Sequence, residues 1–331
     1  SYPKNVCVKR FYSHYIWGNN VIKYIKNRKK PDVIYAAIPS LTAANKVAKY
    51  CKANDIRFVI DVQDLWPEAF QMVVNIPIVS ELAFAPFKFL ADGIYKRADE
   101  IVAVSKSYAN RARRVNKNAR AHAIYLGTEL DKFDEYLTSE TVIKKNANEV
   151  LIAYCGTLGS SYDITIVIEA LKRLDSEGIK NYRFIVMGDG PRFDEFKLMA
   201  KKAGINAFFT GRIPYDQMCA TLKNCDITVN PIAHNAAQSI INKHADYVAA
   251  GLPIVSTQES LEFRKLIDKY EMGFNVDNSD VLGLASKLKL LIKDKDLRIK
   301  MGNNARKCAK KRFDRKLTYE VIVRAIEGRD D

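Results

Sequence analysis

The chain has 331 residues, of which 48% are hydrophobic and 27% charged, and its formal net charge is +15. This composition is that of an ordinary globular protein and excludes a mainly disordered chain, and the length suggests two domains that each bury a core. No apolar run approaches the length that a membrane-spanning helix needs.

The cysteines and the charges indicate which kinds of site and partner to expect. The six cysteines lack the close spacing and histidine partners of a metal site, so neither a zinc site nor a disulfide framework is expected. Residues 1–120 contain 21 Lys and Arg against 9 Asp and Glu, a net charge of +12. The excess favours an anionic partner for this part, but no recognition motif indicates a nucleic acid.

Short β-branched apolar runs alternate with longer amphipathic stretches along the chain. This pattern is typical of strand–helix–strand units and predicts an α/β fold with parallel sheets. The first group of predicted strands is residues 32–38, 57–62, 100–105 and 121–126. After the polar stretch 139–149, a second group is predicted at residues 150–156, 182–188, 207–211, 225–231 and 252–257.

The polar interruption predicts two domains joined by a linker near residues 140–148. The first domain is expected to comprise residues 1–140, and the second residues 148–311. The amphipathic segment 312–328 follows the second sheet, and we expect it to fold back as a helix onto the first domain.

Four loops of the second domain follow the predicted carboxyl ends of strands, where ligands bind in parallel α/β sheets. Two of them are rich in glycine, which lets backbone N–H groups approach a phosphate closely but is also a routine turn residue. The candidate residues in the first three loops are Gly156, Thr157, Gly188, Gly190, Arg212 and Ile213.

The fourth loop leads into a predicted helix. Ser239 is its expected N-cap, which would leave the N–H groups of Ile240 and Ile241 available to a ligand. Lys243 would lie in the first turn, with Asp246 three residues on along the same face. A diphosphate at the helix start and a diol beside the carboxylate would use these groups. The alternative is a capped helix with an incidental ion pair.

Eight segments spread over nearly the whole chain carry a family resemblance. They are "DVQDLWPEAF" (61–70), "EIVAVSKSY" (100–108), "LGTELDKF" (126–133), "AYCGTLG" (153–159), "VMGDGP" (186–191), "FTGRIPYDQM" (209–218), "DYVAAGLPIVST" (246–257) and "DLRIKMGNNARKCAKKRF" (296–313). The combination resembles the retaining nucleotide-sugar glycosyltransferases of family 4, especially the bacterial enzymes of surface-polysaccharide assembly. The resemblance implies the GT-B fold, in which two Rossmann-like domains with parallel sheets face each other across a cleft.

The resemblance implies roles for residues of the second domain. Asp246 matches the second glutamate of the family's Glu, seven residues, Glu motif, and would accept hydrogen bonds from the ribose hydroxyls. Gln238 matches the first glutamate, which contacts the donor sugar. Gly156 and Thr157 match the loop at the donor diphosphate.

The two phosphates of such a donor need compensating positive charge. The arginine and lysine usual near the family's diphosphate loop are absent from "GTLGSSYD" (156–163). Lys243 and Arg212 are the candidates to replace them, and a charge-assisted contact contributes about 1.5–3 kcal/mol. No metal or cofactor is expected.

In the first domain, Gln63 and Asp64 follow the predicted strand 57–62. Family members often have a histidine at the position of Gln63, so the resemblance implies that this residue orients the reacting sugar. Asp64 would hold an acceptor hydroxyl. The family's first strands and glycine-rich loop precede the equivalent of "KPDVIYA" (30–36), where this chain has only a short aromatic and basic stretch. We therefore expect the beginning of the acceptor domain to be missing.

The expected function is retaining transfer of a sugar, hexosyl or N-acetylhexosaminyl, from a nucleoside-diphosphate donor, most simply a UDP-sugar. The expected acceptor is a lipid-linked saccharide in capsule or O-antigen assembly. One alternative is a nucleotide-sugar epimerase of the same fold, and another is a non-catalytic partner subunit that binds sugar nucleotides. The lack of a histidine-and-carboxylate set for deprotonating a sugar carbon disfavours the epimerase.

A lipid-linked acceptor implies a cytoplasmic protein that binds the inner face of the membrane peripherally. The segment 79–100 interleaves phenylalanines with Lys88, Lys96 and Arg97, which suits an anionic membrane surface. The alternative is that the aromatic residues form the core face of an ordinary helix and only the charges meet lipid.

Overall fold

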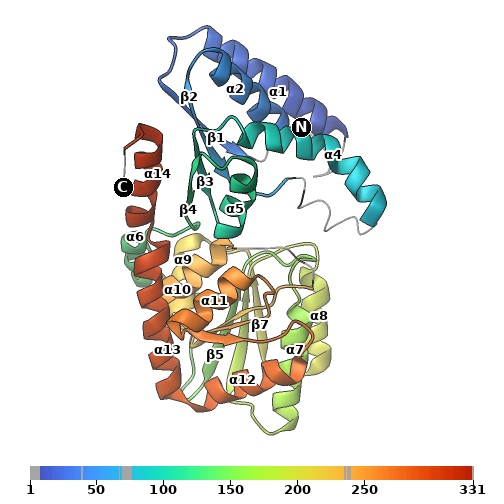
Figure 1. Ribbon diagram of the computed structural model, residues 1–331. Helices are drawn as coiled ribbons and strands as arrows, with labels where there is room; N and C mark the ends of the chain where they lie inside the picture. The colour runs from blue at the N-terminus through green and yellow to red at the C-terminus, as the bar shows by residue number, and fades with distance from the viewer. Residues whose placement is uncertain are drawn as a thin grey trace. The chain divides into compact units, whose positions relative to one another are not determined.

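The computed structural model describes residues 8–38, 40–66, 68, 77–234, 236 and 240–329. The chain forms two compact units, residues 1–125 with 317–331 and residues 126–316 (Figure 1). Each unit contains a parallel sheet with helices packed on it, so the predicted α/β class with two parallel sheets is confirmed. The expected domain ranges, 1–140 with 312–328 and 148–311, stay a prediction.

The first unit contains a four-stranded parallel sheet with the order β1-β2-β3-β4. The strands are β1 (Val33–Ile38), β2 (Arg57–Val62), β3 (Glu100–Ala103) and β4 (Arg120–Ala123). The helices are α1 (Val8–Lys26), α2 (Leu41–Ala53), α4 (Pro77–Tyr95), α5 (Lys106–Val115) and α14 (Arg315–Glu327). The strands agree with the predicted ones to within three residues, because β-branched runs buried in a parallel sheet give a strong sequence signal.

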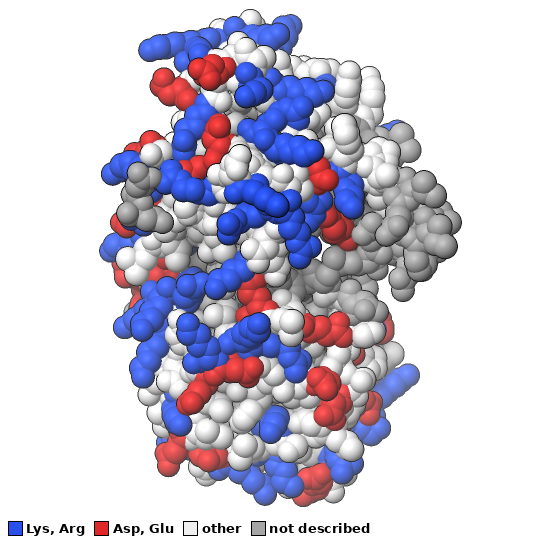
Figure 2. Space-filling view, in the orientation of Figure 1, with Lys and Arg blue, Asp and Glu red and all other residues white. Residues whose placement is uncertain are grey.

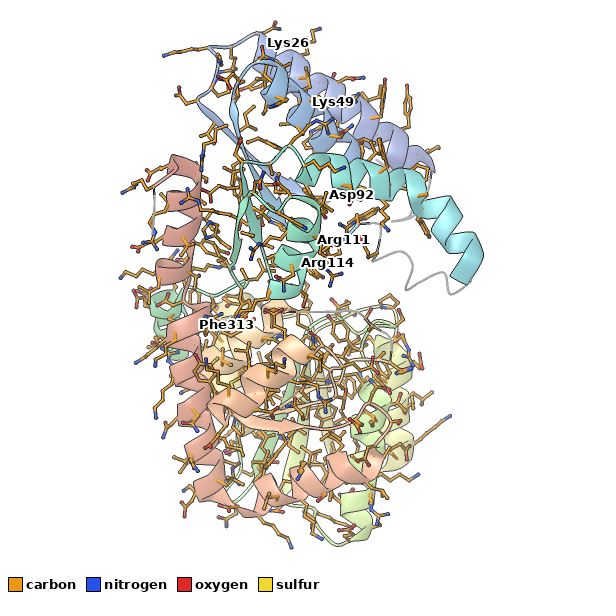
Figure 3. The ribbon with its side chains drawn as sticks, viewed as in Figure 1. Lys26, Lys49, Asp92, Arg111, Arg114 and Phe313 are labelled. Atoms are coloured by element: carbon orange, nitrogen blue, oxygen red, sulfur yellow. The ribbon has the colours of Figure 1, made fainter. Side chains whose placement is uncertain are left out.

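Helix α5 illustrates how local sequence and packing cooperate in the first unit. The Ser105 hydroxyl caps the helix by accepting a hydrogen bond from the Tyr108 backbone N–H at 3.2 Å. Arg111 on the same helix pairs with Asp92 of α4 at 2.8 Å and also with Glu68 (Figure 3). These ion pairs connect α5 to Glu68, which precedes residues 69–76, and to helix α4, which follows them.

The second unit contains a six-stranded parallel sheet with the order β10-β9-β8-β5-β6-β7. The strands are β5 (Val150–Cys155), β6 (Tyr182–Met187), β7 (Ala207–Gly211), β8 (Ile227–Asn230), β9 (Ile254–Ser256) and β10 (Gly273–Asn275). The helices are α6 (Leu130–Glu135), the 3₁₀ turn η1 (Tyr136–Thr138), α7 (Ile164–Ser176), α8 (Phe193–Ala203), α9 (Tyr215–Lys223), α10 (Asn242–Ala250), α11 (Leu261–Tyr270), α12 (Val281–Lys293), α13 (Lys295–Cys308) and the π-helical turn η2 (Ala309–Phe313). Strand β10 was not predicted.

The strand order places a switch point beside β5. The chain runs from β5 to β6 and β7 on one side, and then crosses to β8, β9 and β10 on the other. Ligands bind at the carboxyl ends of strands at such a point, because the loops there diverge and leave a crevice. The loop after β5 and the helix after β8, α10, therefore follow the two strands that flank this point.

Candidate functional site

Three predicted glycines hold the loops after β5 and β6 against each other. A side-chain carbon at Gly188 would lie 1.9 Å from the Gly156 carbonyl oxygen, and one at Gly190 would lie 2.4 Å from the Leu158 oxygen. Gly156 and Gly188 also have φ angles of +134° and +145°, which side chains disfavour. The glycines thus permit a close approach of backbone to backbone, and this accounts for them without a ligand. Their role in phosphate binding stays a prediction.

The hydrogen bonds of these loops limit what the backbone can offer a ligand. The Gly156 N–H donates to the Met187 carbonyl and the Leu158 N–H to the Asp189 carbonyl, both at 2.9 Å. Thr157 is exposed, and its carbonyl accepts a hydrogen bond from the Tyr154 hydroxyl at 2.7 Å. The N–H groups of Gly156 and Leu158 are therefore occupied within the protein.

Helix α10 begins later than predicted. Its N-cap is Ile241, so the expected N-cap at Ser239 is wrong. The His244 ring replaces a serine cap, since its Nδ1 accepts a hydrogen bond from the Ile241 N–H at 3.3 Å. This N–H is therefore not directed to a ligand, and Ile240 is buried. Gln238 and Ser239 themselves lie outside the described residues.

Lys243, in the first turn of α10, is buried and unpaired. Its side chain is 7% exposed, and Nζ has no hydrogen-bond partner among the described residues. The ammonium lies 3.7 Å from the centre of the Tyr162 ring and 4.1 Å from that of Tyr154. A side-chain carbon at Gly156 would lie 3.0 Å from Nζ, so Gly156 leaves room for it. Burial lowers the pKa of Lys243 to about 7.

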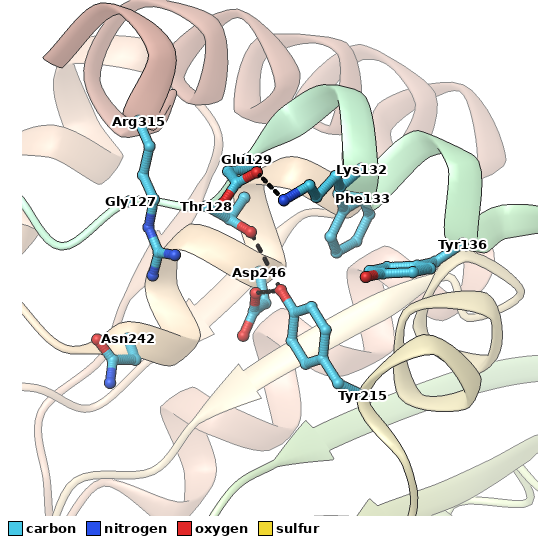
Figure 4. Close-up of a pocket in the computed structure, with 10 residues that line it drawn as sticks. All are labelled: Gly127, Thr128, Glu129, Lys132, Phe133, Tyr136, Tyr215, Asn242, Asp246 and Arg315. Carbon is cyan, nitrogen blue, oxygen red and sulfur yellow. Dashed lines mark hydrogen bonds and ion pairs between the residues drawn. The ribbon is translucent and has the colours of Figure 1, made fainter. Parts of the chain in front are cut away.

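Asp246 lines a separate pocket of about 340 Å³ within the second unit (Figure 4). The Tyr215 hydroxyl donates to Asp246 Oδ1 at 2.7 Å and lies 3.1 Å from the Thr128 hydroxyl. Burial raises the pKa of Asp246 to about 6, while the Tyr215 hydrogen bond and the Arg315 charge act in the opposite direction. The lining residues are Gly127, Thr128, Glu129, Lys132, Phe133, Tyr136, Tyr215, Asn242, Asp246 and Arg315.

The structure therefore separates the two groups that the sequence placed side by side. Lys243 contacts the aromatic rings beside Gly156, whereas Asp246 is bonded to Tyr215 of α9. The alternative of an incidental surface ion pair does not describe Lys243, because its ammonium is buried and no ion pair to it occurs in the described part of the chain. Tyr154, Tyr162 and Tyr215 were not predicted as site residues.

The remaining predicted residues lie elsewhere. Arg212 is exposed and Ile213 half-buried, in the turn between β7 and α9 that leads to Tyr215. Gln63 and Asp64 are exposed and follow β2 in the first unit. The Gln63 side-chain amide donates to Asp61 Oδ2 at 2.8 Å.

Three curated proteins are similar to the chain. An uncharacterized glycosyltransferase of Methanocaldococcus jannaschii is 25% identical over 75% of this chain and 63% of its own length. A putative colanic acid biosynthesis glycosyl transferase of Escherichia coli, WcaI, is 24% identical over 92% of this chain and 75% of its length. An α-1,4-N-acetyl-D-galactosaminyltransferase of Campylobacter jejuni, named for its undecaprenol diphosphate-linked GalNAc acceptor, is 26% identical over 49% of this chain and 44% of its length. The chain thus spans less than two thirds of the length of the first and the third.

The fold resembles that of solved glycosyltransferases. The crystal structure of Anabaena HepE in complex with UDP has a TM-score of 0.74 to this chain, with 18% identity over 94% of this chain and 82% of that one. The family model described as "Glycosyl transferases group 1" matches residues 138–308, more than half of the chain. The protein therefore belongs to the glycosyl transferases group 1 family.

Proposed function

We propose that the protein is a retaining glycosyltransferase of family 4 that transfers a sugar from a UDP-sugar to a lipid-linked saccharide in capsule or O-antigen assembly. The observation that carries the proposal is the buried, unpaired ammonium of Lys243 beside the Gly156 loop, at the switch point of a parallel sheet. A buried charge without a partner is unfavourable, and a bound anion would supply the missing partner.

Lys243 and Asp246 have complementary tasks in this proposal. Lys243 neutralises the diphosphate, which also becomes the leaving group when the donor sugar is transferred, so that its charge is worth most in the transition state. Asp246 accepts hydrogen bonds from the ribose hydroxyls in the pocket of Figure 4. The other proposed donor-binding residues are Gly156, Thr157, Gly188, Gly190, Arg212, Ile213, Gln238 and Ser239.

The acceptor side of the proposal rests on the first unit. Gln63 and Asp64 orient the reacting groups, and the excess of basic residues suits the anionic inner leaflet that carries a lipid-linked acceptor. Lys and Arg predominate on the face of the first unit that Figure 2 shows. The acceptor named for the C. jejuni relative is of this lipid-linked class. None of the helices among the described residues combines the length and the apolar character needed to cross a bilayer.

Calorimetry on the chain of residues 1–331 tests the donor site. We expect UDP to bind more tightly than uridine, since the diphosphate meets the ammonium, and we expect Lys243→Met to reduce this difference. Lys201→Met, at an exposed lysine of α8, is the matched control and should bind like the parent chain. Equal affinities for UDP and uridine would contradict the diphosphate site.

A further inference from the structure

Thr128, Tyr215 and Asp246 form a hydrogen-bonded chain in the second unit that brings together distant parts of the sequence. Thr128 precedes α6, Tyr215 is the first residue of α9, and Asp246 lies in α10. The Tyr215 hydroxyl is 3.1 Å from the Thr128 hydroxyl and 2.7 Å from Asp246 Oδ1. The Tyr136 ring packs edge-on against the Tyr215 ring, with 6.0 Å between their centres, and so restricts where the hydroxyl can lie (Figure 4).

The chemistry of the three groups determines which of them donates and which accepts in each hydrogen bond. An ionised carboxylate only accepts hydrogen bonds, so the Tyr215 hydroxyl must donate to Asp246. The Tyr215 oxygen then accepts from Thr128. Asp246 Oδ1 is thereby held by Tyr215, whereas Oδ2 has no hydrogen bond from the described residues and is available to a ligand in the pocket.

Several ionisable groups surround Asp246, and of these the Tyr215 hydroxyl is the one hydrogen-bonded to the carboxylate. The others are Cys155 at the end of β5, Cys219 of α9, Glu129, Lys132 of α6, Tyr247 of α10 and Arg315 at the start of α14. Glu129 and Lys132 pair with each other at 2.6 Å, so their charges largely cancel. Burial favours the protonated form of Asp246, and Tyr215 and Arg315 favour the ionised form.

We propose that Tyr215 is a positioning residue that makes the site prefer a ribonucleoside diphosphate over its 2′-deoxy counterpart, by fixing the Asp246 carboxylate in one orientation. This inference rests on the proposed function, which takes Asp246 as the ligand of the ribose hydroxyls. A polar group fixed against a hydroxyl rejects the analogue that lacks it, because the group is then left without its partner. A carboxylate that is free to rotate can form hydrogen bonds with other partners when the hydroxyl is missing, and so it distinguishes the ribonucleotide from its 2′-deoxy counterpart less well.

The test compares UDP and 2′-deoxy-UDP by calorimetry from pH 5 to pH 8. In Tyr215→Phe we expect the UDP affinity to fall by roughly three- to tenfold, about the net effect of one ordinary hydrogen bond, because Asp246 is no longer held in one orientation. The affinity ratio of UDP to 2′-deoxy-UDP should fall as well. The midpoint of the pH dependence of UDP binding should move to higher pH, because Asp246 loses a hydrogen bond that favours its ionised form. A merely structural role would not move the ratio or this midpoint.

Two further variants complete the design. Thr128→Val should change the ratio in the same direction but less, since it acts on Asp246 only through Tyr215. Tyr270→Phe, in α11, removes a tyrosine hydroxyl outside the pocket lining and is the matched control. Melting temperatures within a few degrees of the parent would show that the variants are folded. If Tyr215→Phe does not fold, Thr128→Val provides the test in its place.

Asp246→Asn separates the two possible failures. If this variant keeps both the affinity for UDP and the preference over 2′-deoxy-UDP, Asp246 is not the ribose ligand and the proposed assignment fails. If Asp246→Asn loses the preference while Tyr215→Phe keeps the parent ratio and pH midpoint, the role of Tyr215 is wrong and the donor site stands.

Discussion

The Lys243 ammonium lies against the rings of both Tyr154 and Tyr162, at 4.1 and 3.7 Å from their centres, and it has no hydrogen-bond partner among the described residues. The faces of aromatic rings attract a cation, and a desolvated contact contributes about 2 kcal/mol. This is less than the several kcal/mol that removing an ammonium from water costs. Lys243 thus carries a local penalty, as is common for groups retained for function.

The first prediction concerns Lys243→Met. Replacement of an unpaired buried charge by an apolar side chain of similar length should leave the melting temperature at pH 7 unchanged or raise it. The rate of sugar transfer should nevertheless fall by roughly 10²- to 10³-fold, the typical effect of deleting one electrostatic stabiliser of a transition state. Turnover with a UDP-sugar and thermal unfolding measure the two effects. A large loss of stability together with parental turnover would show that Lys243 is structural.

The second prediction is a pH dependence of stability that Lys243 causes. Its pKa is about 7 in the folded chain and about 10.5 for an ordinary lysine. Between these values the unfolded chain binds the proton and the folded chain does not, so this residue's contribution to the free energy of unfolding rises with pH. The stability of the parent relative to Lys243→Met should therefore increase from pH 7 to pH 9.5. Urea unfolding of both chains measures it, and Lys201→Met should show no such trend.

The parts of this site that the sequence predicts are those that depend on neighbouring residues, and the parts that it misses depend on residues far apart in the sequence. The strands after which Gly156 and Gly188 stand were located correctly, because a buried strand is a local apolar pattern. The three-residue strand β10, Gly273–Asn275, is half-buried and has no such pattern. The start of α10 was misjudged because the His244 ring, stacked on Phe263 at 3.4 Å between ring centres, took over the cap.

The Tyr215 contacts show what no local pattern contains. Tyr215 stands 31 positions from Asp246 and 87 from Thr128, and their contact depends on the order of the strands between them. "FTGRIPYDQM" (209–218) and "LGTELDKF" (126–133) were recognised as family-like segments, but nothing in their composition distinguishes a tyrosine that orients a carboxylate from one in a core. Tertiary structure was needed to assign it a partner.

A third prediction tests the explanation of the glycines. Gly188→Ala would place a carbon 1.9 Å from the Gly156 oxygen, so the two loops must separate. Gly178→Ala is the matched control, since Gly178 also has a positive φ, +80°, but no atom within 4 Å of the added carbon. The free energy of unfolding of the control should fall by about 1–2 kcal/mol from backbone strain alone, and that of Gly188→Ala should fall clearly more. Equal losses in urea unfolding would show that the contact with Gly156 is unimportant.

The last prediction concerns binding to a membrane surface, and helix α4 provides the pair of variants. Phe87 is partly buried and packs against the core of the first unit, whereas Phe89 is 80% exposed. The sequence left open whether these rings insert into lipid or form a core, and their burial now suggests different answers for the two. If the first unit binds an anionic leaflet, Phe89→Ser should weaken binding to anionic vesicles without lowering the melting temperature. Phe87→Ser should instead destabilise the fold, by a few kcal/mol for loss of a large buried side chain.

Cosedimentation with vesicles containing phosphatidylserine, at low and at physiological salt, measures the binding. The exposed Lys88 and Lys96 of this region contribute about 1 kcal/mol each near such a surface, so binding should weaken as salt screens them. Vesicles of phosphatidylcholine alone should bind little of the protein, because they carry no net negative charge and only the aromatic side chains can then contribute to binding. If the parent chain ignores anionic vesicles even at low salt, a lipid-linked acceptor loses its physical support and a soluble acceptor becomes the better proposal.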